Sequence, residues 1–302
     1  MPTYNFKKEL KLYVVSNNIK HRLNIYSDVN FSQTFNETPV QVKTLHTPYN
    51  MFDDAVIKKA NPANFNFSLL LDRSTQFAAI FDLILSYDNT SSEVVMKSAD
   101  YYIEMNTEIF KLEKGVIESA VFQIARNQLI TLNCSGTASK LYKVASIPGT
   151  ASTYSYSTAN YTSPNSLEIK LAGQVMDNVS AISLEIKNNV NWIDYATLQN
   201  SQNVTNASDT MYPEAFVVPG RTLSGYVQQY VIDTNMGTVN TWKRGDSLSF
   251  KMGSTSSTWI LSVNIPSVIY TNRSDLQDML MQSFDFRMVA SPLDLNTVVQ
   301  LI

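Results

Sequence analysis

The two histidines are the first residues to test for catalysis, because imidazole is the usual general base of nucleophilic hydrolases. His21 takes an apolar position in an alternating segment, which favours a core or interface histidine over a base. His46, in "KTLHTP", precedes an expected turn and could orient that loop through a hydrogen bond. Neither residue lies in a G-x-S-x-G, H-E-x-x-H or H-x-E pattern. The sequence therefore gives no support to histidine-based hydrolysis.

Arg221 is the residue best placed to bind an anion. It lies between Gly220 and Gly225 in "VPGRTLSGY", and such a segment could form a nest of backbone N–H groups. A turn at Gly220 followed by a strand with a bulge at Gly225 explains the same residues more simply. We favour this structural interpretation, because the chain holds no complete phosphate-loop motif.

Asp53 and Asp54, in "NMFDDAVIKK", resemble part of a hard-cation site. A calcium loop needs further oxygen ligands at fixed spacing and a turn glycine, and the segment has neither. We expect a solvated pair of loop carboxylates that answers Lys58 and Lys59 across a subunit contact. The sequence therefore predicts no metal site.

The remaining reactive groups do not form a catalytic set either. Cys134 is the single cysteine, so it cannot form an internal disulfide, and its apolar neighbours favour a buried thiol. A glycosidase needs two carboxylates in one cleft, and nothing in the sequence pairs any two of the 26 acidic residues. We expect no catalytic residue, no cofactor and no enzymatic activity, with a β-rich glycosidase as the weakest alternative.

Composition limits the partners and the compartment. Only 16% of the 302 residues are charged and the net charge is −3, so electrostatics give no reason to grip a phosphate backbone. No apolar run approaches the roughly 20 residues of a membrane span, and the N-terminal segment does not resemble a secretory signal. We therefore expect a soluble protein that folds in a cytoplasm.

Alternation with a period of two residues dominates the chain and predicts an antiparallel β protein, in sandwich or barrel form. Residues 19–31 are the clearest example and are expected to form one long strand. Further predicted strands cover residues 10–15, 39–45, 64–71, 100–106, 116–125, 129–134, 166–171, 179–190, 222–232, 247–252, 257–265 and 282–289.

Two segments have helical patterns. Residues 72–88 place Phe77, Ile80, Phe81 and Ile84 on one apolar stripe. Residues 272–283 begin with Ser274 and have Gln277 three positions later, which is a capping-box pattern. Each helix is expected to flank a sheet.

A run without charged side chains, "IPGTASTYSYSTANYTSPNS", divides the chain nearly in half. It predicts a domain at 1–148, a linker or surface loop at 149–166 and a second domain at 167–302. The halves also echo each other, because each has a long alternating strand, a polar stretch and a proline-containing turn into another strand. We infer a duplication as a hypothesis.

The segment "VNFSQTFNETPVQVKTLHTPYNMFDDAVIKKANPANFNFSLLL" (29–71) resembles phage tail tube proteins, in which a long strand and loop precede a K-x-N-P-A-x-F turn. The similarity continues in "LEKGVIESAVFQIARNQLITLNCSGTASKL" (112–141), "LEIKNNVNWIDY" (184–195) and "PGRTLSGYV" (219–227). Together these segments resemble the two-tube-domain type of tail tube subunit found in some long-tailed siphophages.

The resemblance implies a major tail tube subunit without catalytic activity, assembled in the host cytoplasm and located in the virion tail. Each of its two domains would be a β-sandwich or barrel with a flanking helix and a long projecting hairpin. Three copies would form a pseudo-sixfold ring, or six copies if each chain held one domain. Stacked rings would contact the tape measure protein and neighbouring tail proteins, and genomic DNA would pass through transiently without specific binding.

The residues expected to act in this assembly fall into two groups. Pro62 and Phe65, with their echoes Pro213 and Phe216, are predicted to be turn and core anchors. The candidates for subunit contacts lie in the projecting segments, although any one of them could equally pack on its own domain; they are Phe35, Val40, Val42, Leu45, His46, Trp192, Ile193 and Tyr195.

Three alternatives stay open at this point. A baseplate hub or tail terminator could be built from the same fold. The tube of a related injection machine is equally compatible. A carbohydrate-binding β-sandwich would use the abundant Tyr, Trp and Asn side chains for stacking and hydrogen bonding.

Overall fold

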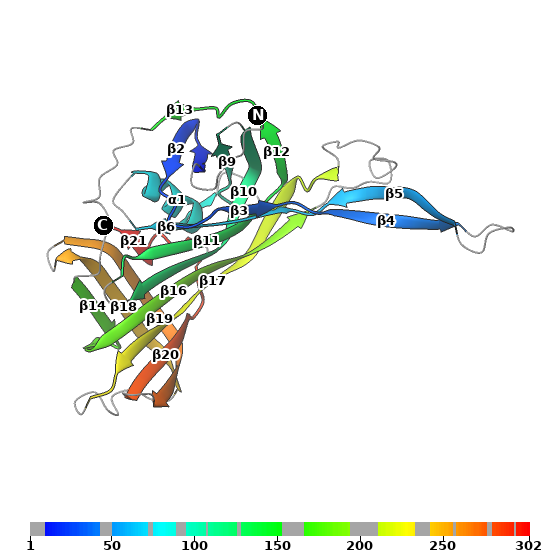
Figure 1. Ribbon diagram of the computed structural model, residues 1–302. Coiled ribbons are helices and arrows are strands. Elements are labelled where there is room, and N and C mark those ends of the chain that lie inside the picture. The colour runs from blue at the N-terminus through cyan, green and yellow to red at the C-terminus, as the bar shows by residue number, and fades with distance from the viewer. Residues whose placement is uncertain are drawn as a thin grey trace.

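The computed structural model is mainly antiparallel β, as the alternating sequence predicts, with the one α-helix of its described residues packed on the sheets (Figure 1). It describes residues 10–42, 50–71, 75–88, 95–106, 108–125, 128–152, 166–193, 211–232, 242–255, 258–276, 280–292 and 294–302.

The first half of the chain contributes a set of short strands, one long strand and the helix. The strands are β1 (Lys11–Ser16), β2 (Ile19–Leu23), β3 (Asn30–Ser32), β4 (Phe35–Val42), β5 (Asn50–Ala60), β6 (Ala63–Leu70), β7 (Tyr87–Asp88), β8 (Val95–Met96), β9 (Ala99–Met105), β10 (Glu108–Ala125), β11 (Thr131–Ala138), β12 (Lys140–Val144) and β13 (Thr150–Ala151), and the helix is α1 (Thr75–Leu85).

The second half contributes longer strands. They are β14 (Ser166–Leu171), β15 (Gln174–Val175), β16 (Val179–Ile193), β17 (Ala215–Tyr230), β18 (Trp242–Thr255), β19 (Thr258–Leu276), β20 (Leu280–Met288) and β21 (Val299–Leu301).

The longest strand of the first half, β10, belongs to two parts of the sheet system. Its first part pairs with β9 and β12, and its second part pairs with β11 and β16. The change falls at a bend, where Lys114 has a φ of 51° and the ladder to β9 shifts register before Gly115. A Cβ on Gly115 would lie 2.6 Å from the Tyr101 ring, so the bend depends on a glycine at this position.

The order of strand pairings in the first half recurs in the second. Seven strand pairs of the first half each have a counterpart in the second half. The first-half pairs are, in order, β1–β2, β1–β9, β9–β10, β10–β11, β10–β12, β6–β11 and β3–β6. Their counterparts, in the same order, are β14–β15, β14–β18, β18–β19, β19–β20, β19–β21, β17–β20 and β16–β17. The first hairpin of each set also has a two-residue turn with positive φ, at Asn17–Asn18 and at Ala172–Gly173.

The two sets of strands are joined by the pairing of β10 with β16. As a result, eight strands follow one another in the order β3–β6–β11–β10–β16–β17–β20–β19. Figure 1 shows β11, β10, β16 and β17 running side by side across the middle of the molecule. The division into domains 1–148 and 167–302 stays a prediction, and most of the expected linker lies outside the described residues.

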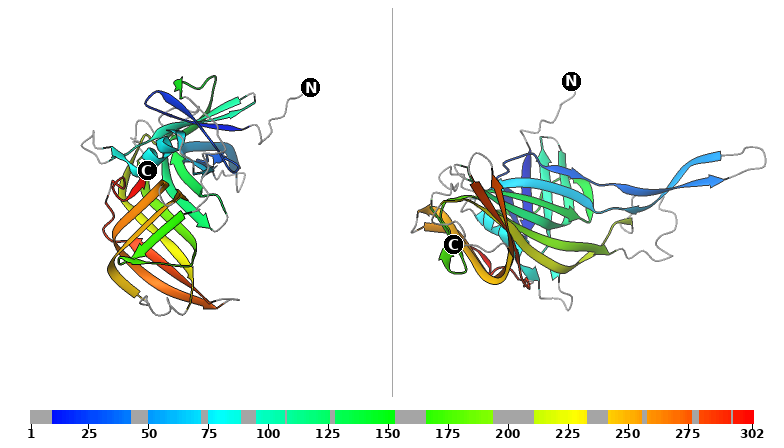
Figure 2. Two further views of the ribbon diagram at one scale, coloured as in Figure 1. Left: turned by 90° about the vertical axis from the view of Figure 1, so that its left-hand side faces the viewer. Right: turned by 90° about the horizontal axis from the view of Figure 1, so that it is seen from below.

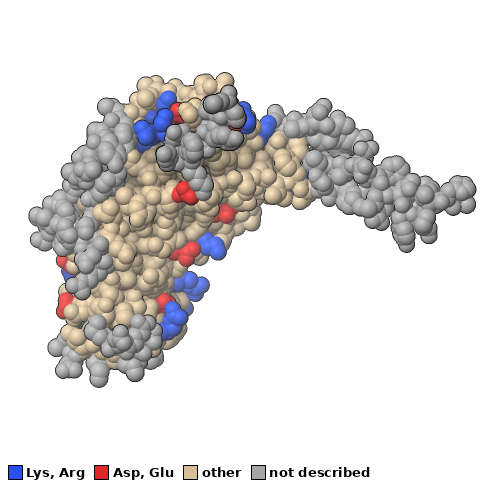
Figure 3. Space-filling model, in the orientation of Figure 1, with Lys and Arg blue, Asp and Glu red and all other residues tan. Residues whose placement is uncertain are grey.

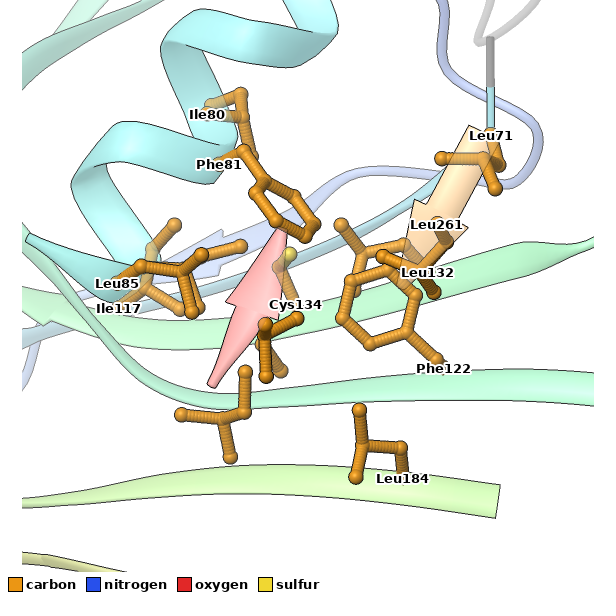
Figure 4. Packing of buried hydrophobic residues seen from close by; sticks show 14 of the residues in the cluster. Leu71, Ile80, Phe81, Leu85, Ile117, Phe122, Leu132, Cys134, Leu184 and Leu261 are labelled. Carbon is orange, nitrogen blue, oxygen red and sulfur yellow. The ribbon is translucent and has the colours of Figure 1, made fainter. Parts of the chain in front are cut away.

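Buried side chains of both halves form one hydrophobic core. In β6, Phe65, Phe67 and Leu69 are buried while Asn64 and Asn66 are exposed, as the alternation predicts. Figure 4 shows the core between α1 and the sheet, with side chains from β10, β11, β16 and β19 facing the helix.

Helix α1 lies on this core through the predicted apolar stripe. Phe77, Ile80, Phe81 and Ile84 are all buried. The Phe81 ring packs edge-on against Phe122, with 5.6 Å between the ring centroids (Figure 4). The helix predicted at 72–88 is therefore confirmed, with its described part at Thr75–Leu85.

Two sequence predictions about elements are wrong. Residues 272–283 do not form a helix, because β19 extends to Leu276 and pairs with β20 from Leu280 onward, so sheet pairing overrides the local capping pattern. Residues 19–31 are not one strand but β2 and β3. Between these strands, Ile25 bridges to Leu69 and the Tyr26 N–H donates to the Ser68 carbonyl at 2.7 Å, which moves the chain to another partner strand.

Gly225 gives a direct test of the packing between β16 and β17. A Cβ at Gly225 would lie 2.0 Å from the Ser183 carbonyl oxygen, whereas a Cβ at Gly220 would have only Asn189 Nδ2 nearby, at 3.9 Å. We expect Gly225→Ala to lower the free energy of unfolding in urea by about 1–3 kcal/mol. Gly220→Ala in the same strand is the matched control and should change it by less than about 0.5 kcal/mol. Equal effects of both variants would contradict the close approach.

Candidate subunit-contact surface

The segment predicted to project forms a two-stranded antiparallel hairpin. Strands β4 and β5 pair from Phe35 with Ala60 to Val42 with Asn50. Figures 1 and 2 show this hairpin extending well away from the rest of the chain. A hairpin that contacts its own chain only at the base has most of its surface available to another molecule. We call residues 35–60 the arm.

The base of the arm is closed by Asn61. Its N–H donates to the Thr34 carbonyl at 2.9 Å, and its side-chain Nδ2 donates to Thr34 Oγ1 at 2.9 Å and to Asn36 Oδ1 at 3.2 Å. Pro62 follows and is partly buried, and Phe65 is only 3% exposed in the core. The predicted turn at Pro62 and core anchor at Phe65 therefore lie where the arm returns to the sheet.

Gln33 ties the same base to the neighbouring strand β12. Its Nε2 donates to the Asn61 carbonyl at 2.9 Å and to the Ser139 carbonyl at 3.1 Å. Its Oε1 accepts from the Leu141 N–H at 2.9 Å. One side chain thus satisfies three backbone groups from distant parts of the chain, which fixes the direction in which the arm leaves the sheet.

The second long hairpin, β16–β17, packs its outer end on the first half. Trp192 and Phe216 face each other across this hairpin, with ring centroids 5.3 Å apart. The Trp192 indole N–H donates to Thr137 Oγ1 at 2.8 Å, and Thr137 donates to Glu118 at 2.6 Å. Phe216 is buried beside Val116 of β10. Phe216 therefore packs between the halves rather than in the main core.

The segment that leads into β17 continues this contact toward the arm. Tyr212 is buried in a cluster with Ala60, the last residue of β5, and Lys140 Nζ lies 4.8 Å above the Tyr212 ring centroid. Pro213 accepts a hydrogen bond on its carbonyl from the Ser139 hydroxyl. Lys114 Nζ donates to the Glu214 carbonyl at 3.1 Å. The described part of the second hairpin thus supports the base of the arm.

Arg221 is buried and holds the C-terminal end of α1. Its Nε donates to Asn188 Oδ1 at 2.7 Å, its Nη1 donates to the Leu85 carbonyl at 2.6 Å, and its Nη2 donates to the Ile84 carbonyl. Asn188 in turn donates to the Ile117 carbonyl at 2.7 Å. A cation at this helix end complements the helix dipole and pairs its last carbonyls.

The buried position of Arg221 excludes the anion nest considered for it, because its guanidinium faces backbone carbonyls rather than a ligand. Burial lowers its pKa to about 10, an effect that the charges of Asp294 and Tyr87 oppose. Gly225 is paired regularly with Leu184, so the predicted bulge there is wrong, and the nearest irregularity lies between Val179 and Ala181.

The structure places the subunit-contact candidates unequally. Phe35 is 43% exposed at the base of the arm, and Val40 and Val42 lie in β4. Trp192 and Ile193 are partly buried at the outer end of β16. Leu45, His46 and Tyr195 lie outside the described residues. The contacts of these residues with another subunit stay a prediction.

The other residues singled out for chemistry occupy structural positions. Asp53, Asp54 and Lys58 belong to strand β5, so their expected place in a loop is wrong. Cys134 is buried, as predicted, and burial raises the pKa of its thiol. Within the described ranges, no group of three or more His, Cys, Asp and Glu residues gathers as a metal site would require. No helix in the described part of the chain is both long enough and apolar enough to cross a membrane.

Charged side chains of both signs are interleaved on the face shown in Figure 3 rather than gathered by sign. Among the described residues, several charged side chains form ion pairs, such as Lys143 with Glu108 at 2.6 Å and Lys243 with Asp246 at 2.9 Å. Such a face has no strong field of one sign with which to hold a polyanion.

The functional residues that sequence reasoning missed are Gln33, Asn61 as a side-chain donor, and the partners of Arg221. Their roles depend on contacts between residues far apart in the chain, such as Arg221 with Leu85. No local pattern encodes such contacts. The one available signal was the lone arginine between two glycines in "VPGRTLSGY".

Removing the Arg221 guanidinium should weaken the join between α1 and β17. We expect Arg221→Met to lower the free energy of unfolding by about 2–3 kcal/mol, because it leaves buried carbonyls without donors. Arg244→Met is the control, since Arg244 is exposed on strand β18; it should cost less than about 0.5 kcal/mol. Urea unfolding followed by tryptophan fluorescence measures both, and a loss no larger for Arg221→Met than for Arg244→Met would refute the role.

His21 should make stability depend on pH. Its Nδ1 is buried without a hydrogen-bond partner among the described residues, and burial lowers its pKa below 6.5. The unfolded chain therefore binds a proton more readily, so stability is lost as the pH falls below 6.5 toward the folded-state pKa. We expect the urea midpoint of His21→Gln to change less between pH 7 and pH 5 than the midpoint of the wild type. A His21→Gln protein whose urea midpoint depends on pH in the same way as that of the wild type would contradict this prediction.

Comparison with known proteins supplies the family. No curated protein matches the chain. The model of the Bacteriophage Baseplate Tube Protein Family matches residues 2–298, nearly the whole chain. This match supports a structural protein of the phage tail or baseplate, and the fold of the chain is mainly β. This protein belongs to the Bacteriophage Baseplate Tube Protein Family.

Proposed function

We propose that this protein is a structural, non-catalytic subunit of a ring in the phage tail tube, at the level of the baseplate. Three copies would close one ring with pseudo-sixfold symmetry. The observation that carries the proposal is the recurrence of the first half's pairing order in the second half, joined by β10 and β16. A chain that already contains two similar units side by side needs half as many copies to close a ring.

The polar face of the eight-stranded run suits a channel wall. It carries hydrogen-bonded amide and hydroxyl pairs, such as Asn30 with Asn66 at 3.0 Å and Ser68 with Asn133 at 2.6 Å. These groups satisfy each other and are uncharged, and the same face also carries charges of both signs, such as Glu185 and Lys187 of β16 and Asp285 and Arg287 of β20. Such a wall would let genomic DNA pass transiently without specific binding.

The position along the tail distinguishes two versions of this function. Membership of a baseplate tube protein family supports the first version, a segment of tube within the baseplate. A major tail tube subunit, expected from the sequence resemblance, is the second version and would contact the tape measure protein along the whole tail. In both versions the protein is made in the host cytoplasm and ends in the virion.

A saccharide-binding role is the alternative from another class, and one hollow favours it. This hollow measures about 590 Å³ and is lined by uncharged residues, including the exposed Tyr26 together with Gln123, Gln128 and Asn133. An aromatic ring beside amide groups is a suitable surface for a neutral sugar. Binding to a glycan array would support this alternative.

Electron microscopy and copy counting test the proposal. We expect the purified protein to form rings with a hollow centre whose mass corresponds to three chains. In virions, antibody labelling should mark the baseplate end of the tail, with only a few multiples of three copies per particle. Labelling along the whole tail would favour the major tail tube instead. A protein that stays monomeric at every concentration, and that is absent from purified virions, would contradict both versions.

A further inference from the structure

Among the described residues, the last part of strand β19 has an open edge where its counterpart β10 has a partner. The second part of β10 lies between β11 and β16. In β19, Thr271 still pairs with β18, but Asn272–Leu276 pair only with β20 among the described residues. An open row of backbone donors and acceptors at a sheet edge is a template for another strand.

Strand β3 has the complementary open edge. Its counterpart β16 pairs with β17 on one side and with β10 on the other. In the part of the chain that the structure describes, β3 pairs only with β6. The two open strands stand at opposite ends of the eight-stranded run, seven strand spacings or about 34 Å apart along the sheet. They do not pair with each other in the described part of the chain.

We propose that the open edge of β19 in one copy pairs antiparallel with the open edge of β3 in the next, and that this contact repeats the internal pairing of β10 with β16. The partner is therefore a second copy of this chain. The inference rests on the proposed ring and deepens it, because it assigns the two strand edges that close the ring. A contact between two different edges is heterologous and generates a closed ring when the rotation permits.

Two phenylalanine–glycine pairs between neighbouring strands show which residues of the two halves are equivalent. Phe65 of β6 faces Gly136 of β11, and Phe286 of β20 faces Gly225 of β17. In each pair a Cβ on the glycine would collide with the facing ring, at 2.7 Å for Gly136 and 2.9 Å for Gly225. The two pairs thus occupy equivalent positions in the two halves. Phe65 of β6 corresponds to Gly225 of β17, and Gly136 of β11 corresponds to Phe286 of β20.

Counting from these pairs gives the expected contact residue by residue. Ser32 of β3 takes the place of Glu185 of β16, and Arg273 of β19 takes the place of Val121 of β10. Val121 and Glu185 face each other within the chain. Arg273 of one copy should therefore face Ser32 of the next, and Asn272–Leu276 should lie antiparallel to residues 29–33.

The side chains at both edges fit a contact that forms after folding. Ser32 and Asn30 are exposed, and the Arg273 side chain is 72% exposed. Its ion pair with Asp285, at 2.5 Å, lies on the β20 side and leaves the backbone edge open. Polar edges of this kind keep the single chain soluble until a matching strand arrives.

A cysteine pair tests the register. Ser32→Cys combined with Arg273→Cys should give disulfide-linked species of two and three chains on non-reducing gels, because facing strand residues have Cα atoms within disulfide range. Native Cys134 is buried and should not interfere. Mixing the two single variants should give linked pairs, whereas neither variant alone should give any.

Two further variants serve as controls. Ser32→Cys with Ser283→Cys should not link, because Ser283 faces Arg273 from β20 and lies one strand, about 4.8 Å, farther from the proposed neighbour. Val121→Cys with Glu185→Cys should form the same bond inside one chain and show that the internal junction permits it.

Amide hydrogen exchange of the wild type gives a second test that needs no substitution. Residues 29–33 and 272–276 should exchange at least about tenfold more slowly in the assembled protein than in the dilute monomer. Three-chain rings without the Ser32–Arg273 link and without this protection would overturn the edge assignment and leave the ring standing. A chain that never associates would overturn the ring and the edge assignment together.

Discussion

The pairing of β10 with β16 is the interaction on which the rest of the structure depends. β10 accepts four neighbouring strands because it bends at Gly115, where the Tyr101 ring leaves no room for a side chain. Its second part then lies between β11 and β16, so the ladders of the two halves become one continuous run. The hydrophobic core follows, since Phe122 and Leu184 face the same interior across this ladder (Figure 4).

The same junction is reinforced on the helix side. Arg221 reaches from β17 to the last carbonyls of α1, and Asn188 links it to the backbone of β10. A buried cation is costly unless all its donors are satisfied. Here each donating nitrogen finds a carbonyl or amide oxygen, so the charge orients the helix relative to the sheet instead of opening the core. The outer end of the β16–β17 hairpin, with Trp192 on Thr137, adds a second brace near the base of the arm.

Most strands could be predicted from the sequence because burial on one face of a sheet imposes a period of two, and β6 and β16 show that period clearly. The helix α1 followed from its stripe of Phe77, Ile80, Phe81 and Ile84. The failures have a common cause. Residues 19–31 and 272–283 have local patterns for one strand and one helix, but their partners, β6 and β20, decide their conformation. The contacts of Gln33 and Arg221 join residues up to 137 positions apart, which no local pattern can encode.

In the proposed three-chain ring, the covalent connection between the halves would also change the kinetics of assembly. Six separate units would need five bimolecular association steps before the ring could close, and the rate of each step would depend on concentration. In this chain the β10–β16 ladder forms as part of folding, so every second contact is intramolecular and has a high effective concentration. Only the contacts between chains then depend on how much protein the host has made, which favours complete rings over open fragments when subunits are scarce.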